Sequence, residues 1–83
     1  MATFEETKRN LLRRTGLIEC MSRLGQREGK FDCFTVTILY NKLSGEAINW
    51  HIASDLMNKL SNDGFLSTHG VGGKFGAVIY SIR

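Results

Sequence analysis

Hydrophobic and polar positions divide the 83 residues into three helical segments followed by two short extended segments. Residues 3–26 are mostly good helix formers, and Thr3 followed by Glu6 fits a capping box at the start of a helix. The dipeptide Thr15-Gly16 is its weak point, because glycine costs about 1 kcal/mol inside a helix, so a kink or break is expected there if anywhere. The apolar residues of this segment fall near helical spacing: Phe4, Leu11, Leu12, Ile18, Met21 and Leu24.

The second segment, residues 31–43, is rich in β-forming residues, so propensity alone allows a strand. We predict a helix over about 33–43 instead, because Phe34 and Ile38 keep the i, i+4 spacing of a helix. Asp32 is a suitable N-cap, and Ser44-Gly45 is a suitable end. Gly29 is predicted to end the preceding helix in a left-handed conformation.

The third segment, residues 50–62, is the clearest helix, with Asn49 as its N-cap and a stop at residues 62–64. Residues 65–69 and 77–82 then read as two strands joined by the glycine-rich stretch 70–76. Apolar residues form one stripe along the predicted third helix: Ile48, Ile52, Ala53, Leu56, Met57 and Leu60.

A short helix, the tight turn 43–47, a second helix and the corner 63–66 before a hairpin follow the order of a winged helix-turn-helix. The stretch 48–66, with Leu56 and Leu60, resembles the recognition helix and first wing strand of winged-helix regulators. The resemblance covers about the last 50 residues and implies an α+β winged helix, three helices followed by a C-terminal β-hairpin wing. The single domain 1–83 would comprise a long N-terminal helix (1–28), a helix-turn-helix (32–64) and the wing hairpin (65–83). An unrelated small α+β fold is the alternative.

The resemblance also implies a nucleic-acid surface on the third helix and the wing. Asn58 and Lys59 would contact bases or phosphates in a major groove, and Lys74 would reach a phosphate or the minor groove. Trp50 has a competing and more common role as a core anchor. The candidate residues for nucleic-acid binding are Arg13, Arg14, Trp50, His51, Ser54, Asn58, Lys59 and Lys74.

The charge distribution keeps a second class of function open. The net charge of +3 comes entirely from residues 1–30, where seven basic residues stand against four acidic ones. DNA-reading winged helices usually carry several cations on the recognition helix, whereas this one offers Lys59 against Asp55. Either Arg13 and Arg14 complete the footprint, or the fold binds protein.

Two hypotheses follow. The first is a small DNA-binding transcriptional regulator, dimeric through the first helix. The second is a protein-binding adaptor or inhibitor, of the size of phage accessory proteins such as host-polymerase modulators and cytoplasmic lysis-inhibition factors. An exposed apolar patch around Trp50 would favour protein, and a basic stripe joining Arg13, Lys59 and Lys74 would favour DNA.

Other chemistry receives little support. A chain of this length buries only about two-thirds of its unfolded surface and has little volume for a deep catalytic pocket, so we expect no enzyme and no cofactor. The close spacing of metal ligands is absent among His51, His69, Cys20 and Cys33. The glycine-rich stretch precedes a strand, whereas a phosphate-binding loop must precede a helix. We expect reduced cysteines, no membrane insertion and a cytoplasmic location.

Overall fold

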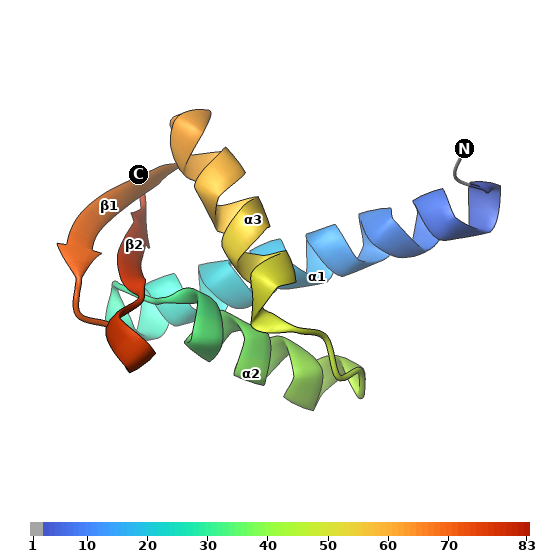
Figure 1. The fold of residues 1–83 in the computed structure, drawn as a ribbon, viewed down its shortest axis with the longest axis horizontal. Helices are drawn as coiled ribbons and strands as arrows, with labels where there is room; N and C mark the ends of the chain where they lie inside the picture. The colour runs from blue at the N-terminus through green and yellow to red at the C-terminus, as the bar shows by residue number, and fades with distance from the viewer. Residues whose placement is uncertain (1–2) are drawn as a thin grey trace.

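Three helices precede an antiparallel hairpin in the computed structural model, which describes residues 3–83 (Figure 1). The predicted fold class is therefore confirmed: the layout is α+β and consistent with a winged-helix arrangement. Residues 1–2 of the predicted N-terminal helix (1–28) lie outside the described residues. The elements are α1 (Phe4–Glu28), α2 (Cys33–Ser44), α3 (Trp50–Asn62), β1 (Leu66–Val71), a 3₁₀ turn η1 (Lys74–Gly76) and β2 (Val78–Ile82).

Each helix begins at the N-cap that the sequence predicts. The Thr3 hydroxyl accepts a hydrogen bond from the Glu6 N–H, and the Asp32 carboxylate accepts one from the Thr35 N–H at 2.8 Å. The Asn49 side chain caps α3 in the same way. The second segment, for which a strand was the alternative, is therefore a helix as predicted, and the Asp32 cap stabilises its first turn.

Helix α1 runs without interruption through Gly16. A Cβ atom at this position would lie 2.7 Å from Cε1 of Tyr40 on α2. The glycine therefore allows α2 to approach α1 closely, and the kink that its low helix propensity allowed is absent.

The hydrophobic core lies where α1, α2, α3 and the hairpin meet. In α1 the buried face consists of Leu17, Cys20, Met21 and Leu24. Four of the six apolar residues at helical spacing along α1 are exposed, and the first three of them lie on the N-terminal half of the helix, which projects beyond the rest of the domain (Figure 1). Those exposed residues are Phe4, Leu11, Leu12 and Ile18.

Backbone hydrogen bonds join the two strands of the hairpin to each other and also to the residues before α2. β1 and β2 pair with Leu66 opposite Ile82 and Thr68 opposite Tyr80, and the register shifts between Thr68 and Val71. Phe31, just before α2, exchanges two backbone hydrogen bonds with Tyr80, at 2.9 and 2.8 Å. The sheet is thereby joined to the start of α2.

Candidate binding surface

Four rings gather where the first turn of α3 meets the wing. Phe34 of α2 lies 5.0 Å, centroid to centroid, from both Trp50 and Phe75, and His51 stacks on Trp50 at 3.7 Å. Trp50 is 38% exposed and Phe75 is 90% exposed. We call Phe34, Trp50, His51 and Phe75 the aromatic surface.

The wing is held against α2 by the buried carboxylate of Asp32. One oxygen of this side chain caps α2, and the other accepts a hydrogen bond from the Lys74 N–H at 3.1 Å. Gly73 is required next to it, since a Cβ there would lie 2.7 Å from Asp32 Oδ2. The wing tip is thus tied to the start of α2, beside Phe34.

Phe75 has a strained backbone within this tied turn. Its φ of 55° lies in the left-handed region, which costs a residue with a side chain about 1–2 kcal/mol. The ring gains little burial in return, because nine-tenths of it faces solvent. Strain at such positions is concentrated at functional sites.

A shallow hollow next to the rings is bordered by Cys33, Ser54 and Val78. Burial raises the pKa of the Cys33 thiol, and the nearby Asp32 carboxylate raises it further. The thiol is therefore protonated at neutral pH and is not activated as a nucleophile.

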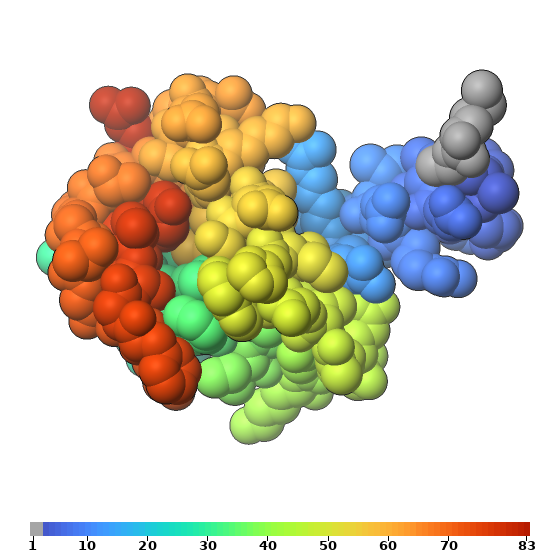
Figure 2. Space-filling view, in the orientation of Figure 1, coloured from blue at the N-terminus to red at the C-terminus, as the bar shows by residue number. Residues whose placement is uncertain are grey.

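A second recess lies between α3 and the projecting half of α1. It encloses about 370 Å³ and is open to solvent. Figure 2 shows it between the yellow-to-orange α3 and the blue half of α1. We call it the α1–α3 groove; its lining residues are Asn10, Arg13, Arg14, Leu17, Ile52, Asp55, Leu56 and Lys59.

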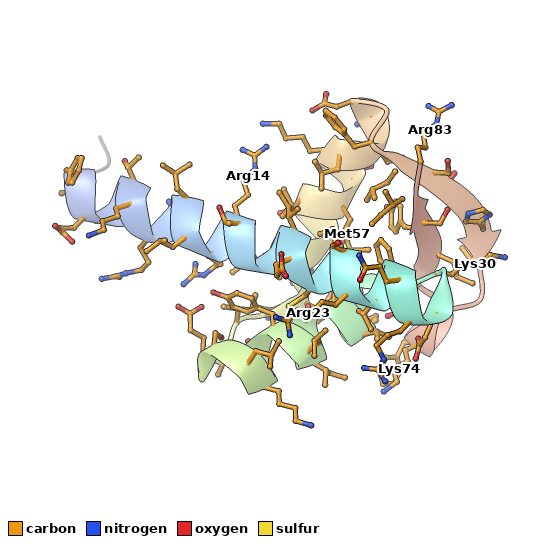
Figure 3. All side chains as sticks on the ribbon, turned by 180° about the vertical axis from the view of Figure 1, so that it is seen from behind. Arg14, Arg23, Lys30, Met57, Lys74 and Arg83 are labelled. Atoms are coloured by element: carbon orange, nitrogen blue, oxygen red, sulfur yellow. The ribbon has the colours of Figure 1, made fainter. Side chains whose placement is uncertain are left out.

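The structure separates the predicted nucleic-acid residues into different environments. Arg14 and Lys59 are exposed at the α1–α3 groove, whereas Lys74 lies on the wing turn beside Asp32. Figure 3 shows Arg14 and Lys74 on different sides of the domain. On α3, His51 and Asn58 are exposed, while Ser54 is half-buried at the hollow.

Arg13 is engaged within the fold. Its Nε lies 3.3 Å from Oε2 of Glu46 in the α2–α3 turn, and the Tyr40 hydroxyl donates to the same oxygen at 2.9 Å. The Tyr40 hydrogen bond is the main cause of the lowered pKa of Glu46, and Arg13 contributes to it. Arg13 therefore fixes α1 to the turn before α3, and the basic stripe through Arg13, Lys59 and Lys74 that would have favoured DNA is not continuous.

The sequence pattern did not reveal the contribution of Phe75 or the role of Asp32 in holding the wing. Both depend on the turn folding back onto α2, and the glycine-rich stretch 70–76 signalled only that a turn exists. Across the hairpin, His69 Nε2 lies 2.6 Å from Ser81 Oγ, a pair the sequence also did not indicate. Both side chains are on the surface of the sheet, outside the hollow and the α1–α3 groove.

Within residues 3–83, no group of three or more metal-ligating side chains is present, and no helix is long and apolar enough to cross a membrane. Comparisons with protein-family models, curated proteins and solved structures find no match to the chain. The class of the protein is therefore defined by its fold: a three-helix and hairpin α+β domain consistent with a winged helix.

Proposed function

We propose that this domain is a protein-binding adaptor or inhibitor that uses a winged-helix scaffold to present the aromatic surface. The observation that carries the proposal is the exposure of Trp50 and Phe75 at the meeting point of α3 and the wing. Trp and other large aromatic residues are enriched in the energetic centres of protein interfaces. The strained backbone of Phe75 supports the same conclusion, because it holds in place a ring that is exposed and contributes little to the core.

Charge supports protein over nucleic acid as the partner. Phosphate contacts supply most non-specific affinity for DNA, and each needs a cation or another donor. Arg13 is neutralised by Glu46, and α3 carries a single basic residue, Lys59, together with a single acidic one, Asp55. The surface that a winged helix would place against DNA therefore has few free cations and several exposed rings.

The proposal is tested by placing a photoreactive benzophenone amino acid at position 75 in cells that produce the protein. We expect irradiation to link the domain to a defined partner protein. The matched control carries the same amino acid at Val71, which is exposed on the hairpin but outside the aromatic surface. Identical adducts from positions 71 and 75, or none from position 75, would contradict the proposal.

A DNA-binding transcriptional regulator is the second candidate, and one observation favours it. Arg14 of α1 and Lys59 of α3 line the same groove, so cations from two helices lie on one side of the domain. The test is fluorescence anisotropy on a labelled random duplex at rising salt. Substituting Arg14 or Lys59 with glutamine should reduce the salt slope by about one each, and lack of binding at low salt eliminates this candidate.

Self-association through α1 is the proposed assembly. Phe4, Leu11 and Ile18 are exposed on α1 at intervals of seven residues, the repeat of two-stranded coiled coils. Sedimentation velocity should show a dimer that Leu11→Asp converts to a monomer. Leu43→Asp, at an exposed position at the end of α2, is the control and should leave the dimer intact.

A cytoplasmic location is part of the proposal. Cys20 and Cys33 are both free and buried, as expected of thiols kept in a reducing compartment.

A further inference from the structure

The α1–α3 groove lies between two helices that run in different directions (Figure 1), and each helix contributes one row of side chains to its walls. Asn10, Arg14 and Leu17 follow the i, i+4, i+7 spacing on α1, and Ile52, Leu56 and Lys59 follow it on α3. Each wall is therefore a single helical stripe. An amphipathic helix can pack along the α3 stripe, with the α1 stripe crossing beside it.

The floor of the groove is apolar. Leu17 is 1% exposed and belongs to the core, while Leu56 is half-buried and Ile52 is exposed. A helix that laid its apolar stripe here would cover Ile52 and the open side of Leu56. The free energy of binding would come from burying apolar surface that the domain itself leaves exposed to water.

The groove is formed before any partner arrives. α1 continues past the body of the domain (Figure 1), and Arg13 is held at this point by Glu46, which Tyr40 also contacts. Because both walls belong to regular helices fixed by these contacts, little ordering is needed on binding. Preformed sites of this kind lose less free energy to immobilisation.

The charges at the rim specify the partner further. Arg14 stands on one wall and Lys59 on the other, and within residues 3–83 neither makes an ion pair. Asp55 is the one carboxylate among the lining residues, and it lies on the α3 wall. A complementary helix carries acidic side chains on both borders of its apolar stripe, opposite Arg14 and Lys59 and away from Asp55.

We infer that the α1–α3 groove binds an acidic amphipathic helix of a partner protein. This inference rests on the proposed protein-binding function, because it names the chemistry of a partner segment. It concerns the side of α3 that faces α1, whereas the aromatic surface lies on the side that faces the wing.

The experiment uses three fluorescent peptides of about 18 residues, roughly 27 Å long as helices. The first has leucines on one face bordered by glutamates, the second has lysines in place of the glutamates, and the third keeps the glutamates but scrambles the apolar face. Anisotropy titration with the full chain should show that the first binds at least about tenfold tighter than either of the others.

Variants of the domain locate the binding. Ile52→Asp should weaken binding of the acidic peptide at least about tenfold. Ile38→Asp, at an exposed position of α2 outside the groove, should leave it unchanged. The double variant Arg14→Glu, Lys59→Glu should reverse the preference, so that the lysine peptide binds more tightly.

Equal binding of the three peptides, or binding that Ile52→Asp leaves unchanged, would overturn the inference. So would binding of duplex DNA that depends on Arg14 and Lys59 while the acidic peptide does not bind, because the groove would then be a nucleic-acid site. A partner linked at position 75 together with no peptide binding removes this inference and leaves the proposed function standing. Peptide binding in the groove without any adduct at position 75 supports the inference and removes the role of the aromatic surface.

Discussion

Replacing Gly16 by alanine sets a local preference against a tertiary contact. Inside a helix, alanine is favoured over glycine by about 1 kcal/mol. At this position, however, the added Cβ would lie 2.7 Å from Cε1 and 3.3 Å from Cδ1 of Tyr40. Normal carbon–carbon contacts are about 3.5–4.0 Å, so the ring or the helix must move by about 1 Å.

The Tyr40 ring has little freedom to move. It is buried, and its hydroxyl donates to Glu46, which is also paired with Arg13. Overpacking in a filled core costs about 1–3 kcal/mol, which equals or exceeds the gain in helix propensity. We expect Gly16→Ala to lower the free energy of unfolding by about 0–2 kcal/mol, since the two terms oppose each other.

Gly25 provides a matched control on the same helix. A Cβ there would meet Cδ1 of Ile82 at 3.1 Å, but this is the end of a flexible and exposed side chain. Gly25→Ala should therefore stabilise the domain by about 0.5–1 kcal/mol. Urea denaturation followed by circular dichroism gives both values.

A double-mutant cycle identifies the cause. With Tyr40→Ala in the background, Gly16→Ala should become stabilising, like Gly25→Ala. If Gly16→Ala already stabilises the wild-type domain as much as Gly25→Ala does, the contact with Tyr40 does not constrain this position, and the reasoning is refuted.

Three further outcomes test the fold and the surface. The pKa of Glu46 is lowered mainly by the Tyr40 hydrogen bond, so its contribution to stability is present above the ordinary value of 4.5 and is lost as pH falls through the lower folded-state pKa. Glu46→Gln should therefore lose less stability than the wild type on acidification, as read from urea midpoints. Asp32→Ala should cost about 1–3 kcal/mol and accelerate amide hydrogen exchange at Lys74, whereas slow exchange there would contradict the tie between wing and α2. Phe75→Gly should change the free energy of unfolding by less than about 1 kcal/mol, because relief of backbone strain offsets the lost ring contact; a larger loss in urea denaturation would show that the ring is part of the core.

Helix starts and ends were predictable because capping is local. The side chains of Thr3, Asp32 and Asn49 each accept a hydrogen bond from an N–H group within three residues. Gly29 ends α1 and Gly45 ends α2, each with a positive φ. Such signals are contained in a few consecutive residues. They also resolved the second segment, where strand propensity and helical spacing disagreed.

The buried face of α1 was not predictable in the same way. Leu11 and Leu17 are equally apolar, and only the positions of α2 and α3 decide that Leu17 enters the core while Leu11 stays in water. The same holds for Arg13, which the basic cluster suggested as a nucleic-acid contact. Its partner Glu46 is 33 residues away along the chain, and no local pattern connects the two.

The two proposed surfaces lie on opposite sides of one helix, which has a consequence for binding. Trp50 faces the wing, and Ile52 faces α1, so α3 alone separates an occupant of the groove from the aromatic surface. A helix with its side chains is about 10–12 Å wide, a span that a single partner covers easily. If one partner contacts both sides, Phe75→Ser and Ile52→Asp each remove one of two linked contacts. Whichever of the two substitutions is made first should then cause most of the loss of partner binding. The other, added to it, should reduce partner binding by less than it does alone.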